Sequence, residues 1–285
     1  MKKDNRFQDL PKDFWANTSL INQRLGYASK KLVDKFPGGF FIPSVQQIEA
    51  LYKSEGLSSE HLILNSKFTI YGEKIIEYFE YRASILTDYV ETMLMDADRA
   101  KKTYLAELSS HKYTCPLPRN NQGKAKGAPR YLNCLINMIA ERTIGNEFID
   151  YDPKEMTAFT IDGIPKRSMT RRVDGAVPGV INPIAIWETK EYYYTTTFGS
   201  KISDGIYATQ LDGHELKEIH NSFGLDVKHI MFVDGHFTWW HSGRSYLCRM
   251  IDILHMGLVD ELMFGYEVIT EWPTTIAEIG SLVKK

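Results

Sequence analysis

The chain has 285 residues, of which 43% are hydrophobic and 25% are charged, and its formal net charge at pH 7 is −2. These values are ordinary for a globular protein with a substantial core, and they exclude a low-complexity chain and a strongly basic one. Three cysteines at irregular spacing, no stretch near the ~18 apolar residues of a membrane span and no apolar signal segment lead us to expect a soluble, cytoplasmic protein with reduced thiols.

The first part of the chain is predicted to be helical. Residues 13–36 carry apolar side chains near helical spacing and end at a Pro-Gly-Gly breaker. Ser44 is a good N-cap for the helix that follows, with Gln47 as its capping-box partner. Residues 69–108 form the longest helical pattern, which fits one long helix or two packed helices. Residues 115–131, rich in Pro, Gly and Asn, are predicted to be a loop before a further helix at 131–145.

After residue 146 the pattern changes to strands alternating with helices. Three strands are predicted at 147–163, 166–177 and 183–192, with turns at Asp162-Gly163 and Pro178-Gly179. The pattern then predicts, in order, a helix, a short apolar strand, an amphipathic helix and a final strand, at residues 203–224, 229–235, 243–262 and 263–272. This order predicts a mixed α/β fold in which a strand meander is followed by crossovers.

The third predicted strand ends in charged residues. Alternation along a strand places Ile186, Glu188 and Lys190 on one face, and a neighbouring strand would bring Asp174 to the same place. Buried charges are costly unless they are paired or bind a metal. Two adjacent carboxylates bind a hard divalent cation, and a nearby lysine offsets their repulsion and helps to orient a water. The pattern therefore indicates either a structural ion pair or a metal-dependent reaction centre.

Asp174 followed by Glu188-Thr189-Lys190 at the end of an apolar strand resembles the motif of the PD-(D/E)XK nucleases, the restriction-endonuclease-like superfamily. The resemblance covers the second half of the chain, where the helix, meander, helix and strand order is also similar. It implies a core with a mixed central sheet flanked by helices, preceded here by an N-terminal helical region. We accordingly divide the chain into a helical region, 1–113, for DNA recognition or dimerisation, and a catalytic domain, 114–285.

The resemblance also implies roles for individual residues. Asp174 and Glu188 would bind one or two Mg²⁺ ions together with the Thr189 carbonyl, and Lys190 would position the attacking water. Glu141, on the preceding helix, is the candidate for an additional acidic residue, with Glu147 second. The sequence departs from the motif in having valine where proline often precedes the aspartate.

Two basic segments flank the motif and favour DNA as the substrate, since Lys and Arg contacts to phosphate supply most of nonspecific DNA affinity. Asparagine and glutamine side chains in the loop add groups that can read base edges. Ser200 and Lys201, at the start of the next predicted helix, are placed where a phosphate could bind. The remaining candidates for DNA contacts are Arg119, Asn120, Asn121, Gln122, Lys124, Lys126, Arg130, Lys166, Arg167, Arg171 and Arg172.

The leading hypothesis is therefore a Mg²⁺-dependent, sequence-specific endonuclease of double-stranded DNA, a type II restriction enzyme. A homodimer would place one active site on each strand of a palindrome. The alternatives are a repair or mobile-element nuclease of the same fold, a non-catalytic DNA-binding protein and, last, a glycosidase that uses Asp174 and Glu188 as its carboxylate pair.

Overall fold

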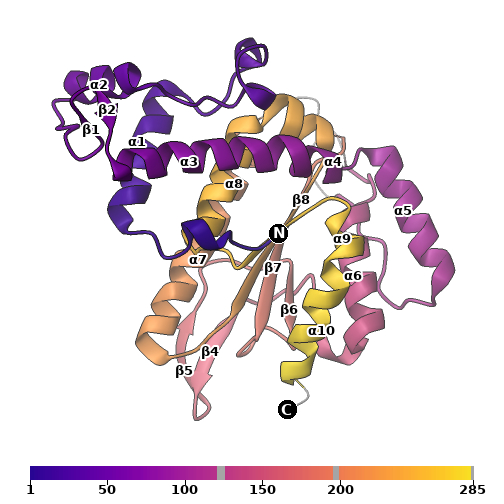
Figure 1. The fold of residues 1–285 in the computed structure, drawn as a ribbon. Coiled ribbons are helices and arrows are strands. Elements are labelled where there is room, and N and C mark those ends of the chain that lie inside the picture. The colour runs from indigo at the N-terminus through magenta and orange to yellow at the C-terminus, as the bar shows by residue number, and fades with distance from the viewer. Residues whose placement is uncertain (121–125, 195–198, 284–285) are drawn as a thin grey trace.

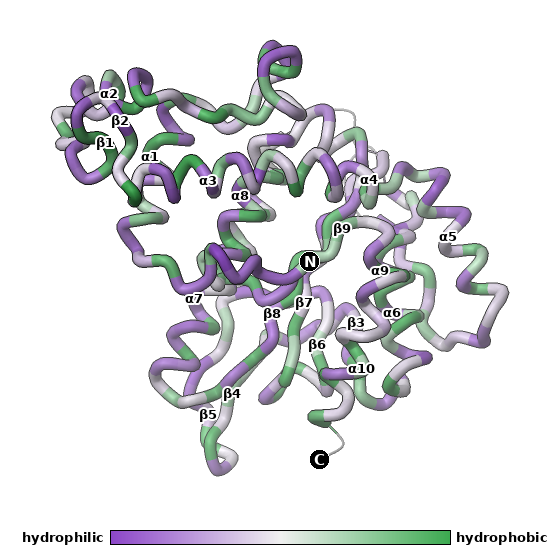
Figure 2. Tube along the Cα trace, in the orientation of Figure 1, coloured by the Kyte–Doolittle hydropathy of each residue, from purple (hydrophilic) through white to green (hydrophobic). Residues whose placement is uncertain are grey.

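The computed structural model, shown in Figure 1, describes residues 1–120, 126–194 and 199–283. Its N-terminal part is mainly helical, as the sequence predicts. The helices are α1 (Lys12–Leu25), α2 (Val45–Ser54), α3 (Ile70–Ser84), α4 (Glu91–Met93) and α5 (Ala97–Ser110), and the short strands β1 (Ile63–Leu64) and β2 (Lys67–Phe68) form a hairpin. Figure 2 shows hydrophilic and hydrophobic residues mixed along the surface helices α3 and α5, and α3 buries Ile75, Tyr78 and Phe79 against the N-terminal core.

The helix ends follow local chemistry. The predicted capping box is confirmed, because the Ser44 hydroxyl accepts from the Gln47 amide and the Gln47 side chain accepts from the Ser44 amide. The helix predicted over 13–36 is too long, since α1 ends before Gly26, whose φ of 95° leaves the helical region. The long pattern at 69–108 is two helical segments. A π-helical turn, Ile85–Val90, follows α3, and Asp96 then caps α5 by accepting from the Arg99 amide.

The rest of the chain forms a five-stranded mixed sheet flanked by helices (Figure 1), which confirms the predicted α/β class. The strands lie in the order β3-β6-β7-β8-β9, with β3, β6 and β7 antiparallel and β7, β8 and β9 parallel. The elements are α6 (Tyr131–Ile144), β3 (Asp150–Tyr151), β4 (Ala158–Ile161), β5 (Ile164–Ser168), β6 (Gly175–Val177), β7 (Ala185–Glu191), α7 (Ser200–Phe223), β8 (Lys228–Asp234), α8 (Arg244–His255), β9 (Glu261–Phe264), α9 (Glu267–Thr270) and α10 (Trp272–Val283).

Three predicted strands are corrected by the structure. The strand predicted at 147–163 is two strands, β3 and β4, because Asp152 takes a positive φ of 59° and Pro153 follows it. The strand predicted at 166–177 is also two, β5 and β6, and β4 pairs with β5 in a separate hairpin. The final strand predicted at 263–272 was wrong beyond Phe264: Gly265 has a φ of 45°, and α9 and α10 follow.

Between β8 and α8, Phe237–Ser242 forms a π-helical turn. Single-turn π segments are frequent at functional sites. Among the described residues, no helix combines the length and the apolar character that a membrane crossing needs.

The two faces of β7 are covered by different helices. Ala185 and Trp187 belong to a core cluster with α6 and α10, while Ile186 packs with residues of α7 on the other face. Glu188 and Lys190 share the face of Ile186, so they lie in the layer between the sheet and α7. This alternation is the one that the sequence predicts.

The helical region is attached to α8 by a buried polar cluster. The Arg82 guanidinium donates to Asp252 Oδ1 at 2.8 Å and to Asn22 Oδ1 at 2.9 Å, and the Tyr78 hydroxyl also donates to Asp252 Oδ1. Asn22 lies in α1, Arg82 in α3 and Asp252 in α8. The cluster therefore ties two helices of the N-terminal region to the helix that packs on the sheet.

His255 gives this attachment a predicted pH dependence. Its Nδ1 lies 2.8 Å from the Ile251 carbonyl and its Nε2 accepts from the Asp4 amide at 3.2 Å, a pattern that only the neutral ring satisfies. Burial lowers the pKa of His255 below its usual value. Because the folded state favours the neutral form, stability is full above the unfolded pKa of about 6.5 and is lost as the pH falls.

We accordingly expect the urea midpoint to fall between pH 7.5 and pH 5.0, and to fall less in a His255→Gln protein. His214, an exposed residue, supplies the matched control His214→Gln, which should keep the wild-type pH dependence. Equal pH dependence in all three proteins would contradict this account.

Candidate active site

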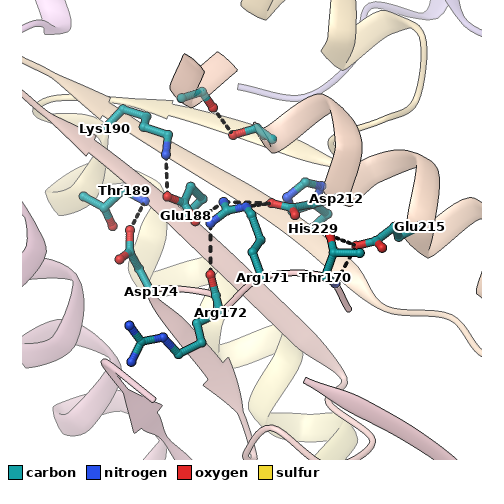
Figure 3. A network of polar contacts seen from close by, with 12 residues as sticks. Thr170, Arg171, Arg172, Asp174, Glu188, Thr189, Lys190, Asp212, Glu215 and His229 are labelled. Atoms are coloured by element: carbon teal, nitrogen blue, oxygen red, sulfur yellow. Dashed lines mark hydrogen bonds and ion pairs between the residues drawn. The ribbon is translucent and has the colours of Figure 1, made fainter. Parts of the chain in front are cut away.

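The site is built around Glu188 on β7. Glu188 and Lys190 are each 7% exposed, and Lys190 Nζ donates to Glu188 Oε1. Gly175 of β6 lies opposite Trp187, so the same antiparallel register carried one residue further places Asp174 opposite Glu188. Asp174 Oδ2 accepts from the Thr189 amide at 2.7 Å. The structure thus brings together the four residues of the motif, as Figure 3 shows.

Two further charged residues complete the network in Figure 3. Arg171 donates through Nη2 to Glu188 Oε2 and through Nε to Asp212 Oδ2 at 3.1 Å, so its guanidinium lies between the two carboxylates. The sequence predicted Arg171 as a DNA contact and gave no role to Asp212. The position of Asp212 in the sequence is the one feature that could have pointed to it. Asp212 lies seven residues after Gly205 on α7, and residues two turns apart share a helix face.

Gly205 of α7 packs against the lysine of the motif. A Cβ at this position would lie 2.9 Å from Lys190 Cε and 3.1 Å from Lys190 Cδ. Gly213 is similarly confined, with the Leu258 carbonyl 2.2 Å from its would-be Cβ. The two glycines that look like weak points in the helical pattern are therefore the places where α7 comes closest to its neighbours.

A Gly205→Ala protein tests whether the position of Lys190 matters. Alanine favours the helix by roughly 0.5–1 kcal/mol, so the protein should fold, but Lys190 must move away from the new methyl group. On the hypothesis of a nuclease, the expected result is a fall in DNA cleavage of about 10–10²-fold, as a misplaced catalytic group predicts. Gly179→Ala is the control, since nothing lies within 4 Å of a Cβ there. Full activity in Gly205→Ala would show that the lysine need not be held in place.

The carboxylates of the network have different electrostatic environments. Burial raises the pKa of Asp174 to about 6, and the neighbouring Glu188 charge adds to this effect. Burial also raises the pKa of Asp212 to about 6, although Arg171 opposes it. Burial acts in the same direction on Glu188, but Lys190 and then Arg171 outweigh it and lower the pKa of this residue. Glu188 is therefore the carboxylate that is held ionised.

The oxygen donors of the site suit a hard divalent cation. Asp174, Glu188 and Asp212 supply carboxylate oxygens and Thr189 a peptide carbonyl, which is the ligand chemistry that Mg²⁺ prefers. The Asp212 Oδ1 atom is buried and has no hydrogen-bond partner within the described part of the chain. In residues 1–120, 126–194 and 199–283, however, no three His, Cys, Asp or Glu side chains are already arranged to hold a metal ion. Arg171 and Lys190 occupy the two Glu188 oxygens instead.

Glu141 is placed away from this network. Its carboxylate accepts from the amides of Thr114 and Cys115 at 2.7 and 2.9 Å and so holds the segment before α6. Glu147 is exposed in a short 3-10 turn. These contacts give Glu141 a structural role.

Glu191, which the sequence did not single out, lies on the opposite face of β7 from Glu188. Its Oε2 accepts from the Asn133 amide at 3.1 Å, in the first turn of α6. Burial raises the pKa of Glu191 to about 7, with Arg130 acting against this shift. A carboxylate at a helix N-terminus is stabilised by the unpaired amides there, so Glu191 fixes α6 against the strand that carries the motif.

The predicted DNA contacts differ in their surroundings. Four of them, Arg119, Lys126, Lys166 and Arg172, are exposed, and Arg130 lies near enough to Asp174 to oppose the rise that burial causes in the pKa of this carboxylate. Arg167 is paired instead with Glu215 and Glu218 of α7, as Arg171 is with Glu188 and Asp212. The Asn120 amide donates to the Ala128 carbonyl at the base of the loop. Asn121, Gln122 and Lys124 lie outside the described residues, and so do the side chains of Ser200 and Lys201.

Comparison with known proteins assigns the chain to a family. Curated proteins and solved structures give no match. One family described as a domain of unknown function, DUF7690, matches residues 1–89, and a second, described as a domain of unknown function, DUF7687, matches residues 95–279. The second match covers more than half of the chain and contains the whole network around Glu188. The protein therefore belongs to the DUF7687 family.

Proposed function

We propose that the protein is a Mg²⁺-dependent endonuclease that cleaves double-stranded DNA at a specific sequence, as a type II restriction enzyme does. The observation that carries the proposal is the buried Glu188–Lys190 pair on one face of β7 with Asp174 opposite it. The order of α6, the antiparallel strands β3, β6 and β7, then α7 and the parallel strand β8 also supports a restriction-endonuclease-like core.

Each residue of the site has a part in this chemistry. Asp174, Glu188 and the Thr189 carbonyl would hold the ion, which when bound polarises a phosphodiester oxygen and favours ionisation of a water. Lys190 donates a hydrogen bond to Glu188, and its ammonium would orient a water beside the scissile phosphate. The enclosed position of the pair strengthens these interactions, since charges act more strongly on each other away from water.

Positively charged side chains beside the site and on the β4–β5 hairpin support DNA as the substrate. Arg172 is exposed next to Arg171, and Arg130 lies near Asp174 at the N-terminus of α6. Lys166 is exposed on the β4–β5 hairpin, which projects from the sheet in Figure 1. Phosphates of a duplex are the expected partners of such side chains. An enzyme that cuts both strands of a palindrome is expected to act as a homodimer. Because its proposed substrate is double-stranded DNA, the proposed location is the cytoplasm.

The direct test is digestion of unmethylated phage DNA with purified protein in Mg²⁺, beside a reaction in EDTA. A restriction enzyme gives discrete, reproducible fragments only with the metal. Nicking that follows DNA structure rather than sequence would indicate a repair or mobile-element nuclease. DNA left intact in both Mg²⁺ and Mn²⁺, across several DNA sources, would contradict the proposed activity.

One observation favours a second candidate. Both Glu188 oxygens are already bonded to cationic side chains, Arg171 and Lys190, as they would be in a purely structural cluster. A DNA-binding protein without catalysis would keep such a cluster. Salt-sensitive DNA binding that persists in Mg²⁺ without cleavage would identify this candidate.

A further inference from the structure

The position of Arg171 is the feature of the site that the proposed metal chemistry does not use. Its Nη2 atom contacts Glu188 Oε2 and also lies 2.9 Å from Asp212 Oδ2, and its side chain is 25% exposed. The two carboxylates come from different elements, Glu188 from β7 and Asp212 from α7. One guanidinium nitrogen therefore bridges them, which is the position that a shared cation takes between two carboxylates.

The burial of the two partners explains why a cation is needed there. The side chains of Glu188 and Asp212 are 9% and 1% exposed. Two buried carboxylates repel each other and cannot both be ionised without a positive charge between them. Lys190 neutralises Glu188 from its other oxygen, Oε1, and does not bridge to Asp212 in the described contacts. Arg171 is the group that joins the two.

The unpaired oxygen of Asp212 points to a ligand. Its Oδ1 atom is buried and has no hydrogen-bond partner among the described residues, whereas Oδ2 contacts Arg171. A buried carboxylate oxygen without a partner is costly. A divalent ion bound between Asp212 and Glu188 would take the place of the guanidinium and would give Asp212 Oδ1 a partner as well.

We propose that Arg171 is an internal counter-ion that competes with the divalent cation for Glu188 and Asp212, and that Asp212 is itself a metal-binding residue. The free protein would then bind the ion weakly, and loading would require the guanidinium to leave. The guanidinium would leave toward the solvent, to which the Arg171 side chain is already 25% exposed. This inference rests on the metal site proposed above but not on DNA as the substrate.

Binding of Mn²⁺ alone to the free protein, measured by the loss of the electron paramagnetic resonance signal of the free ion, tests the proposal. Mn²⁺ takes the same oxygen ligands as Mg²⁺. An Arg171→Met protein should bind Mn²⁺ at least about tenfold more tightly than the wild type, a difference of ~1.4 kcal/mol. Adding Asp212→Asn to that variant should return the affinity to the wild-type value or below it.

The control is Arg167→Met, which removes the neighbouring arginine that pairs with Glu215 and Glu218 and should leave Mn²⁺ affinity unchanged. Circular dichroism checks that each variant is folded. If Arg171→Met does not fold, it is replaced by Arg171→Gln, which keeps a hydrogen-bond donor without the charge. Unchanged or weaker Mn²⁺ binding in the folded Arg171 variant, or binding that ignores Asp212, would overturn the proposal. Because no DNA is present, these outcomes are independent of whether the protein is a nuclease.

Discussion

Replacing Lys190 by methionine is expected to lower the rate of Mg²⁺-dependent DNA cleavage by about 10²–10⁴-fold, the range that a positioned proton-transfer group contributes. Methionine has nearly the same length and keeps the packing against Gly205, where the lysine chain lies within 3.1 Å of a would-be Cβ. What is lost is the ammonium beside Glu188. The rate should be measured in single-turnover reactions on a fragment that the wild-type protein cuts.

A matched control for this variant is Lys166→Met, which removes an exposed lysine from the β4–β5 hairpin. It should weaken DNA binding, with the largest loss at low salt, without changing the rate once DNA is bound. If Lys190→Met retained full activity, the lysine would have no part in the chemistry. Asp174 and Glu188 would then have to act alone, as a carboxylate pair does in a glycosidase.

Replacing Arg82 by methionine is expected to destabilise the protein by ~3–5 kcal/mol, because it leaves a buried carboxylate without its partner. Arg82 is 2% exposed and makes two contacts with Asp252, at 2.8 and 3.1 Å, as well as one with Asn22. Urea unfolding followed by circular dichroism gives the free energy of unfolding. The double variant Arg82→Met/Asp252→Leu should recover much of the loss, since it removes both charges.

The control for this measurement is Arg24→Met, which breaks a surface ion pair with Glu55 at 3.2 Å. Exposed pairs contribute only ~0–1 kcal/mol, so its effect should be small. The Arg82 cluster joins α1 and α3, within the residues 1–89 matched by one family, to α8, within the residues 95–279 matched by the other. The account therefore also predicts one cooperative unfolding transition for both regions. Two separate transitions, with only the first shifted in Arg82→Met, would contradict this coupling.

The sequence predicts correctly those parts of the fold whose structure is decided by a local pattern. The Ser44–Gln47 capping box depends on four consecutive residues, and the alternation of Ile186, Glu188 and Lys190 depends on one strand. Both were predicted correctly. The final strand was wrong because apolar, β-branched residues after Phe264 suit a strand or a buried helix equally well, and burial against the sheet decided for helices.

The residues of the candidate site were likewise predictable where a local pattern decides their position. Glu188, Thr189 and Lys190 lie on β7, and Asp174 directly precedes the adjacent strand β6, so strand pairing brings them together. Asp212 comes from a helix that crosses over the sheet, and tertiary packing, including that of Gly205 against Lys190, fixes which side of that helix faces Glu188. Arg171 was assigned to DNA because a run of basic residues predicts an exposed face, whereas tertiary contacts turn this one side chain inward.

The most direct test of the central claim is a side-by-side digestion of unmethylated phage DNA in Mg²⁺ by the wild-type, Glu188→Gln and Glu218→Gln proteins. Glutamine keeps the size of each side chain and removes one negative charge, at the proposed metal site in the first variant and at an exposed position of α7 in the second. The account predicts the same discrete fragments from the wild-type and Glu218→Gln proteins and intact DNA from Glu188→Gln. Equal cutting by all three proteins, or none by any, would contradict a metal-dependent nuclease site at Glu188.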